Sequence, residues 1–282
     1  GNKRLLEKQI KILNQRFPIN EIKNYNDAKK NIVNIINIEF NFNRIFDKIS
    51  SKSNKYIERS FDESLKIIKK NIKKFVLING PISKKNFLRK NYLGITEYLS
   101  KKINSKNQVM LIYNNEISVS PITTHLPIKY VTKNLSKQKI IENILTIDVF
   151  YKKVIRKKAK FAILGLNPHC ETIDKLSEED LFIKPSIKNL KAKGININGP
   201  FSADTFFLKK NLKKFDVVIG MYHDQVLTPI KTIYEFKAIN ITLGLPFIRM
   251  SPDHGPNSIM LGKNKSDPTS FYYAMKFAEK LK

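Results

Sequence analysis

Short runs of apolar residues alternate with longer segments of helical periodicity through the second half of the chain. Four runs have the length and composition of buried strands, at 160–166, 216–222, 241–243 and 247–250. Apolar residues at helical spacing predict helices at 136–155 and 177–193, and Gly194 is suited to close the second of them. Helices that alternate with short apolar strands predict an α/β fold.

The first half of the chain shows the same two patterns less regularly. The segment 1–13 predicts a helix, and a second helix is expected from Ser60, because Ser60 and Glu63 have the spacing of a capping box. The run 75–78 predicts a buried strand that ends in the turn-forming sequence Asn-Gly-Pro. A chain that begins inside a helix, with no strand before it, is expected to lack the N-terminal part of its fold.

Length and composition limit the classes of protein to consider. With 282 residues, of which 41% are apolar, the chain can form two lobes around a large core. A single cysteine excludes a disulfide framework and a zinc site built from cysteines. No apolar run approaches the ~18–20 residues that span a bilayer, and no apolar signal region stands at the start, so we expect a cytoplasmic protein.

The net charge of +28 raises the question of nucleic-acid binding. Only seven of the 52 basic residues are arginine, and the lysines are spread over every segment rather than gathered on one element. A protein that reads nucleic acid normally uses clustered arginines and aromatic side chains. We therefore interpret the charge as a compositional bias that would also suit a phosphorylated substrate, and we expect neither nucleic acid nor membrane as a partner.

The positions of glycine and histidine narrow the chemistry. No G-x-G-x-x-G sequence occurs, so a Rossmann dinucleotide site is not supported, and Pro200 after the Gly194–Gly199 spacing excludes a Walker A loop. The histidines stand beside the ends of strand-like runs, where ligands bind in α/β sheets. They are His125, His169, His223 and His254. From spacing alone, a divalent-metal site and a set of structural histidines remain equal alternatives.

Charged residues near the same strand ends have candidate roles as well. Asp204, Asp224 and Asp253 could ligate a metal, orient an imidazole or accept a proton, although a single aspartate is often a turn or cap residue. Lys231 and Arg249 are placed to hold a carboxylate or a phosphate. Arg249 is the stronger candidate of the two, because it is one of few arginines and lies in an apolar run.

Several segments resemble, in the same order, the 4-hydroxythreonine-4-phosphate dehydrogenase family of pyridoxal phosphate biosynthesis. They are GLNPH, NGPFSADTFF, MYHDQVLTPIKT, NITLGLPFIRMSPDHG and DPTSFYYAMKFA, preceded by PISKKNF, GITEYL and TTHLPIKYV. The resemblance implies an isocitrate/isopropylmalate dehydrogenase-like α/β fold with an active-site cleft between two lobes. The first lobe would comprise residues 1–92 and 265–282, and the second residues 93–264.

The resemblance also implies the residues of the site. The ligands of a divalent metal (zinc, magnesium or cobalt) would be His125, His169 and His223, contributed from both subunits of a homodimer. The substrate-binding residues would be Thr96, Lys231, Asn240 and Arg249. Asp224 and Lys231 would be the candidates for catalysis. The cofactor would be NAD or NADP, bound without the Rossmann glycines by residues that stay unassigned.

The implied reaction is a metal-dependent oxidation of 4-hydroxythreonine 4-phosphate to a β-keto acid, which loses carbon dioxide to give 3-amino-1-hydroxyacetone phosphate. The chain departs from the family pattern at three places. Ile95 replaces the histidine of a G-H-T-E motif, CETIDKLSEED replaces a glycine-rich loop after His169, and the opening strand with its loop is absent. The alternatives are oxidation of another phosphorylated hydroxy acid or a dihydrodiol, and a non-catalytic binding protein.

Overall fold

The computed structural model describes residues 1–72, 74–88, 91–92, 94–171 and 176–281. Within these residues, eight strands form one mixed sheet in the order β3-β10-β9-β4-β5-β8-β6-β7, and β1 pairs with β2 in a separate parallel ribbon. The strands are β1 (Ile19–Glu21), β2 (Val33–Ile35), β3 (Val76–Ile78), β4 (Val109–Tyr113), β5 (Ser118–Thr123), β6 (Phe161–Leu164), β7 (Ile197–Phe201), β8 (Val217–Tyr222), β9 (Ile239–Leu243) and β10 (Ile248–Pro252).

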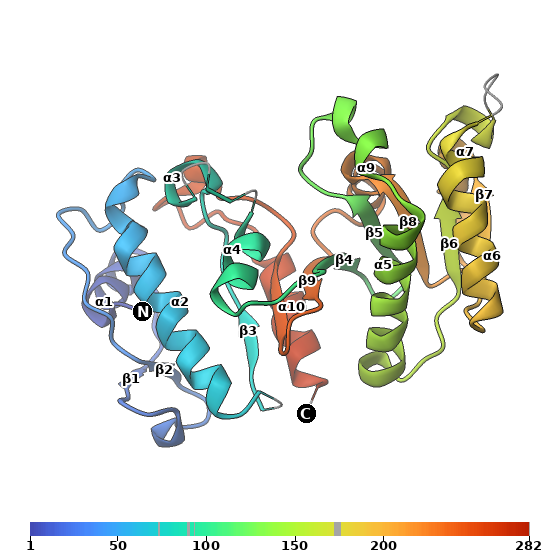
Figure 1. Ribbon diagram of the computed structural model, residues 1–282. Coiled ribbons are helices and arrows are strands. Elements are labelled where there is room, and N and C mark those ends of the chain that lie inside the picture. Colours follow the sequence, from blue (N-terminus) through green and yellow to red (C-terminus); the bar gives the residue numbers. More distant parts are fainter. Residues whose placement is uncertain (73, 89–90, 93, 172–175, 282) are drawn as a thin grey trace.

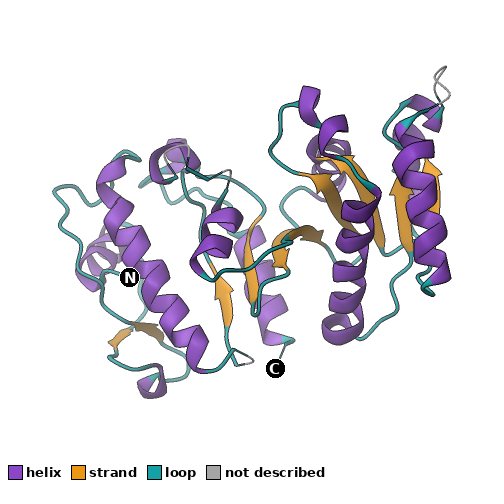
Figure 2. Ribbon diagram, viewed as in Figure 1, coloured by secondary structure: helices purple, strands orange, loops and turns teal. Residues whose placement is uncertain are grey.

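Helices pack along both halves of this sheet, as Figures 1 and 2 show, with α1 to α4 on the side of the N-terminus and α5 to α7 at the other end. The helices are α1 (Lys3–Ile12), α2 (Asn54–Lys70), α3 (Lys84–Phe87), α4 (Ile95–Lys102), α5 (Lys137–Phe150), α6 (Lys184–Ala192), α7 (Ala203–Phe206), α8 (Lys209–Leu212), α9 (His223–Tyr234) and α10 (Thr269–Glu279). Shorter 3₁₀ turns lie at Tyr25–Asp27, Ser51–Ser53, Ile128–Tyr130, Thr132–Asn134, Pro168–Cys170 and Ser258–Met260, and π-helical turns at Tyr151–Ile155 and Glu179–Ile183.

The predicted α/β fold is confirmed. The buried strands explain why short apolar runs in the sequence predicted it. In β6, Phe161 and Ile163 belong to one apolar cluster, whereas Ala162 and Leu164 belong to another on the opposite face. A strand that is covered on both faces needs a continuous apolar run rather than an alternating one. β5, β8, β6 and β7 are parallel neighbours, so their carboxyl ends meet at one edge of the sheet.

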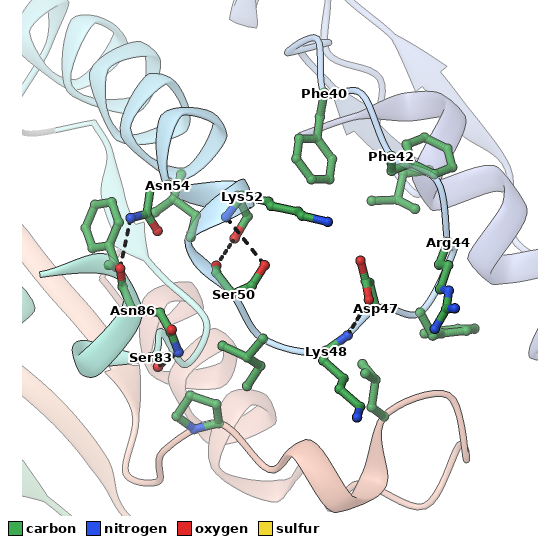
Figure 3. A pocket seen from close by; sticks show the side chains of 18 of the residues that line it. Phe40, Phe42, Arg44, Asp47, Lys48, Ser50, Lys52, Asn54, Ser83 and Asn86 are labelled. Carbon is green, nitrogen blue, oxygen red and sulfur yellow. Dashed lines mark hydrogen bonds between the residues drawn. The ribbon is translucent and has the colours of Figure 1, made fainter. Parts of the chain in front are cut away.

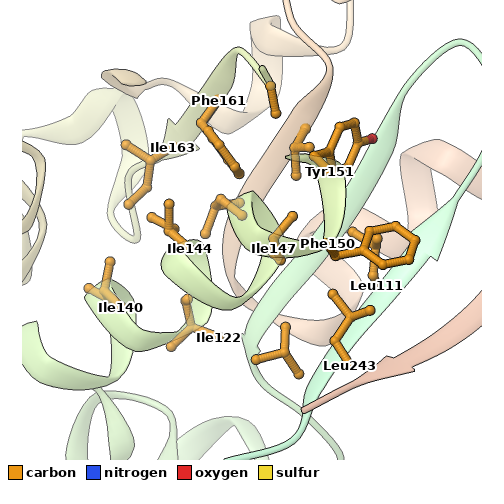
Figure 4. Close-up of a cluster of buried hydrophobic side chains, with 14 of the residues drawn as sticks. Leu111, Ile122, Ile140, Ile144, Ile147, Phe150, Tyr151, Phe161, Ile163 and Leu243 are labelled. Atoms are coloured by element: carbon orange, nitrogen blue, oxygen red, sulfur yellow. The ribbon is translucent and has the colours of Figure 1, made fainter. Parts of the chain in front are cut away.

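The largest core cluster joins α5 to the central strands (Figure 4). Ile140, Ile144 and Ile147 recur at helical spacing on α5 and are fully buried against strand residues such as Leu111 and Ile163. The predicted helix at 136–155 is thereby confirmed, with its last turn in π-helical form. The helix predicted at 177–193 is also present, and Gly194 closes it with a φ of +77°.

A separate apolar cluster holds the N-terminal part of the molecule together. It includes Phe61 and Leu65 of α2, Leu77 of β3, and Ile95 and Leu99 of α4. The division of the lobes between residues 92 and 93 stays a prediction, because α4 follows this boundary in sequence but packs in the cluster that precedes it. The first helix, expected at 1–13, is confirmed as α1.

The start that we predicted for the second helix is wrong. α2 begins at Asn54, six residues before Ser60. Inside the helix, the Ser60 hydroxyl donates to the carbonyl of Tyr56 at 2.8 Å, so it caps no free amide. Inside a helix, a serine hydroxyl can donate to the carbonyl four residues earlier, and the Ser-x-x-Glu spacing alone does not distinguish this position from an N-cap.

The described helices include none that is long and apolar enough to cross a membrane. The cytoplasmic location stays a prediction.

Candidate functional site

A cavity of about 510 Å³ lies between the segment that joins β3 to α4 and the ends of β5, β8 and β10. Six of the eight site residues that the resemblance implied line this cavity: Thr96, His125, His223, Lys231, Asn240 and Arg249. These side chains come from four different elements, α4, α9, β9 and β10, and from the loop after β5, so only the folded chain brings them together. His169 and Asp224 lie outside the lining.

The pairing of β9 with β10 places four polar side chains on one face of the sheet. Asn240 lies opposite Ser251, and Thr242 lies opposite Arg249. Because alternate residues of a strand point to the same side, both pairs share one face, and Asn240, Arg249 and Ser251 all reach the cavity. This face forms the polar wall of the cleft.

Arg249 is the most firmly held cation in the cleft. Its side chain is 3% exposed; its Nε donates to Asn79 Oδ1 at 2.7 Å and its Nη1 to Thr242 Oγ1 at 2.9 Å. Burial lowers the pKa of Arg249 to about 10, and the nearby charge of Glu97 opposes this, so the guanidinium stays protonated at neutral pH. No hydrogen bond to a described residue occupies Nη2, which leaves a donor for an anion in the cavity.

Lys231 and Asn240 supply the other polar contacts. Lys231 donates to the carbonyl of Asp253, and its Nζ lies 3.2 Å from Asp253 Oδ2. Burial raises the pKa of the Asp253 carboxyl, while the charge of Lys231 acts in the opposite direction. In the described part of the chain, Asn240 Oδ1 is buried without a hydrogen-bond partner. A buried acceptor that lacks a partner suits a donor group of a ligand.

Two of the predicted metal ligands lie side by side in the cleft. The ring centroids of His125 and His223 are 5.6 Å apart, and bonds of ~2 Å from metal to nitrogen allow two such rings to share one ion. Partial burial, followed by the charges of Lys84 and His223, lowers the pKa of His125 to about 4. His125 is therefore neutral at physiological pH, the form that binds metals.

The predicted catalytic residue Asp224 lies beside His223. Its Oδ1 is 2.6 Å from His223 Nδ1, and its side chain is largely exposed. A carboxylate on Nδ1 fixes the ring orientation and leaves Nε2 for another partner. This contact suits a role in orienting His223, whereas Lys231 is the candidate that reaches the cavity.

The third predicted ligand, His169, lies away from the other two. It follows β6, its side chain is 75% exposed, and its Nδ1 is 4.0 Å from Asp204 Oδ2. The described residues of one chain contain no group of three His, Cys, Asp or Glu side chains arranged to hold a metal. His254 reaches the cavity, but its ring packs edge-on against Phe236. The role of His169 as a metal ligand stays a prediction.

Comparison with known families assigns the chain. The family described as "Pyridoxal phosphate biosynthetic protein PdxA" matches residues 1–278. The chain belongs to this family.

Several dehydrogenases are similar to this chain over two thirds of its length or more. The 4-hydroxythreonine-4-phosphate dehydrogenase of Sulfurihydrogenibium sp. is 38% identical, in an alignment that covers 100% of this chain and 88% of the relative. The D-threonate 4-phosphate dehydrogenase of Pectobacterium atrosepticum is 34% identical over 67% of this chain and 59% of its own length. Among solved structures, a putative 4-hydroxythreonine-4-phosphate dehydrogenase from Salmonella typhimurium matches with a TM-score of 0.84 at 26% identity, covering 100% of this chain and 89% of that one.

Ile95 occupies the position where the PdxA resemblance leads us to expect histidine. It is the first residue of α4, is 8% exposed, and belongs to the apolar cluster of α2 and β3 while it borders the cavity. An isoleucine there offers no hydrogen bond to a substrate. The wall of the cleft is therefore apolar at this point. The loop that departs from the family after His169 includes residues 172–175, which lie outside the described residues.

A second cavity, of about 530 Å³, borders the first and shares Pro81, Ile82 and Ser83 with it. Figure 3 shows Lys52 and Asp47 pointing into this space, with Phe40 above them. Its lining also includes the basic residues Arg44 and Lys48 and the ring of Phe42. Aromatic rings and cations together suit a ligand that carries a base and phosphates.

Two charged residues of the cleft were missed by sequence analysis. Lys84 Nζ lies 2.9 Å from His125 Nε2, and burial lowers the pKa of Lys84, with the charge of Glu97 acting in the opposite direction. Glu97 Oε2 is buried and has no hydrogen-bond partner among the described residues. Their segments, PISKKNF and GITEYL, carried the resemblance, but nothing in their spacing showed that Lys84 reaches His125 or that the charge of Glu97 acts on Arg249.

Proposed function

We propose that the chain oxidises the secondary alcohol of 4-hydroxythreonine 4-phosphate with NAD or NADP, in a reaction that needs a divalent metal. The observation that carries this proposal is the convergence of two cations, Arg249 and Lys231, with two imidazoles, His125 and His223, in one cavity. Membership of the PdxA family and the names of the relatives support the choice of substrate.

The polar wall of the cleft accounts for recognition of this substrate. Arg249 and Lys231 would bind the phosphate and carboxylate groups, because both are cations whose side chains are anchored at the cavity. Thr96 adds a hydroxyl, which lies 3.4 Å from Thr242 Oγ1. Asn240 Oδ1 would accept a hydrogen bond from the substrate ammonium group, which satisfies a buried oxygen that has no other partner.

The imidazoles of His125 and His223 would hold the metal, and the chemistry of this donor set suits zinc, cobalt or another divalent cation. The cation would supply a positive charge that favours loss of the proton from the substrate alcohol. Asp224 holds Nδ1 of His223, so that Nε2 is directed to the ligand. The third ligand would be His169 from a second copy of the chain, in a homodimer with shared sites.

The reaction also needs a group that exchanges protons with the substrate, an acceptor for the hydride, and a binding site for the dinucleotide. Lys231, held by Asp253 at the cavity as an ammonium group, is the candidate to donate a proton and take one back. NAD or NADP, when bound, would supply the acceptor for the hydride of the alcohol carbon. The resulting β-keto acid loses carbon dioxide, and Arg249 and Lys231 would retain its phosphate. The second cavity would hold the dinucleotide, with Phe40 and Phe42 beside the base and Arg44, Lys48 and Lys52 near its phosphates.

A second candidate substrate is D-threonate 4-phosphate, on which one of the relatives acts by name. The observation that favours it is the apolar wall at Ile95, which removes one polar contact from the cleft. This substrate carries a hydroxyl in place of the ammonium group, so that Asn240 would accept a neutral hydrogen bond.

The test is the formation of NADH or NADPH, followed by absorbance, with both phosphorylated substrates and a series of divalent metals. We expect turnover of 4-hydroxythreonine 4-phosphate that EDTA abolishes and that added metal restores. Faster turnover of D-threonate 4-phosphate would favour the second candidate. Binding of either substrate without any reduction of the cofactor would contradict both and indicate a non-catalytic protein.

A further inference from the structure

A buried carboxylate supports the segment that leads to His169. Glu179 is 0% exposed and begins the π-helical turn that precedes α6. Its Oε1 accepts from the amides of Leu166 and Asn167 at 2.7 and 2.9 Å, and its Oε2 accepts from Asn167 Nδ2 at 2.8 Å. Burial acts to raise the pKa of Glu179, but these hydrogen bonds outweigh it and lower the pKa, so the side chain is ionised.

Two of these hydrogen bonds fix the backbone two and three residues before His169, and the third holds the side chain of Asn167. Leu166 and Asn167 follow β6 and lead into the turn Pro168–Cys170, in which His169 has a φ of +57°. Carboxylates that accept several amide hydrogens form short, directional contacts. In the described part of the chain, Glu179 forms no ion pair with a lysine or an arginine. Its partners are therefore the amide groups of this segment and not a counter-ion.

A buried glutamine connects the same segment to His223. Gln225 Nε2 donates to the carbonyl of Gly165 at 2.7 Å, and Gln225 Oε1 accepts from the amide of Met221 at 2.7 Å. Gln225 stands on α9, two residues after His223. Gly165 is required for this arrangement, since a Cβ there would lie 3.0 Å from Glu179 Oε1 and 2.6 Å from Cys170 Sγ.

We propose that Glu179 is a positioning residue, which fixes the backbone before His169 and so presents its imidazole outward for metal binding. Gln225 sets this segment relative to the start of α9. The part of the inference that concerns metal rests on the proposed function. The part that concerns the backbone does not, because it follows from hydrogen bonds within one chain.

The substitution Glu179→Gln tests the inference, with Glu178→Gln as the matched control. Glutamine keeps the size of the side chain but replaces one accepting oxygen by a donating nitrogen. Glu178 is adjacent, half-buried, and accepts only from Asn167 Nδ2 at 2.8 Å in the described structure. Glu179→Asp keeps the charge on a shorter side chain and serves as the second variant if the glutamine variant does not fold.

Two measurements on each protein distinguish an effect on the backbone from an effect on metal binding. In the metal-free protein, amide exchange of Leu166 and Asn167, followed by NMR, should become about tenfold faster in Glu179→Gln, with the buried amide of Ile219 as internal reference. Affinity for Co²⁺, followed by its visible absorption, should fall about 10–100-fold, the usual effect of losing a group that orients a ligand. Glu178→Gln should leave both values close to those of the wild type.

Unchanged amide exchange and unchanged Co²⁺ affinity in both Glu179 variants would overturn the inference. Faster exchange at every amide, Ile219 included, would also overturn it, because Glu179 would then support the whole fold rather than one segment. If the wild-type protein binds no Co²⁺, the proposed metal site is wrong, and the amide exchange of Leu166 and Asn167 still decides whether Glu179 fixes the segment.

Discussion

In the cleft, Arg249, His125 and His223 border one cavity, whereas His169, at the end of the neighbouring strand β6, is three-quarters exposed. Both regions are held by buried polar contacts: Asn79 and Thr242 hold Arg249, and Glu179 holds the segment before His169. The cleft thus offers its groups to a ligand within the chain. The loop after β6 presents the imidazole of His169 to a group outside the chain, such as a second copy of the protein.

This difference explains why one chain brings only two of the three predicted metal ligands together. A metal that keeps open positions for substrate usually has three protein ligands. In a two-fold symmetric dimer, an exposed side chain on one copy reaches the matching site on the other, and the reverse contact is made as well. The comparison therefore predicts that the cleft binds the anionic substrate by itself but needs a second chain for the metal.

The largest effect is expected from removal of an imidazole in the cleft. His223→Ala leaves His125 as the only predicted ligand within the cleft, so metal binding and metal-dependent turnover should be lost while the protein stays folded. Isothermal titration with Zn²⁺ and circular dichroism measure the two properties. His254→Ala is the control, because His254 borders the same cavity and should be dispensable for the metal. Equal losses in His223→Ala and His254→Ala would mean that His223 has no special role in binding the metal.

A smaller effect is expected from Arg249→Lys, which keeps the charge but loses the planar group that bonds Asn79 and Thr242. A hydrogen bond to a charged group contributes ~1.5–3 kcal/mol, so the KM for the substrate should rise about 10–100-fold with metal affinity unchanged. Arg16→Lys, at an exposed position, should leave the kinetics unchanged. Loss of metal affinity in Arg249→Lys would contradict the assignment of Arg249 to substrate binding alone.

Ile95→His should have a more modest effect of the opposite sign. The new imidazole can donate to a substrate anion, so kcat/KM for 4-hydroxythreonine 4-phosphate should improve by up to about tenfold if this is the substrate. The thermal midpoint should fall, since Ile95 is buried in an apolar cluster. Ile95→Leu should show neither change. A gain with D-threonate 4-phosphate alone would reassign the substrate.

The smallest effect concerns the protonation of His125 in the metal-free protein. Its pKa of about 4 lies below the value of the unfolded chain, about 6.5. Between these values the unfolded state binds a proton that the folded state does not, so this contribution to stability falls as the pH falls from about 6.5 toward 4. Lys84→Met should raise the pKa of His125, followed by its ring resonances in NMR. A pKa that stays unchanged would show that Lys84 does not repel the proton.

The sequence was most informative where burial was complete. β6 and β8, covered on both faces, were readable as apolar runs, and α5 as a helix. The helix α9 was not predicted, because it follows β8 without a loop and contains Pro229, which normally interrupts a helix. The sequence pattern did not predict the strands β4, β5 and β7 either.

For the site, charge and position along the chain indicated Lys231 and Arg249, the resemblance added Thr96 and Asn240, and the structure brings all four together. The supporting residues were not predictable, because their roles depend on contacts between distant segments. Lys84 meets His125 across 41 residues, and Arg249 meets Asn79 across 170. Glu179 lies only 12 residues from Asn167, but nothing in the sequence distinguishes it from Glu178.

The sharing of sites between two chains is tested most directly by complementation. His169→Ala and His223→Ala, co-expressed with different affinity tags, give a mixed dimer in which one site is intact and the other lacks two ligands. Each variant alone should be inactive, whereas the doubly purified mixed dimer should have about half the activity of the wild-type dimer. An inactive mixed dimer, or full activity of His169→Ala by itself, would contradict the shared metal site.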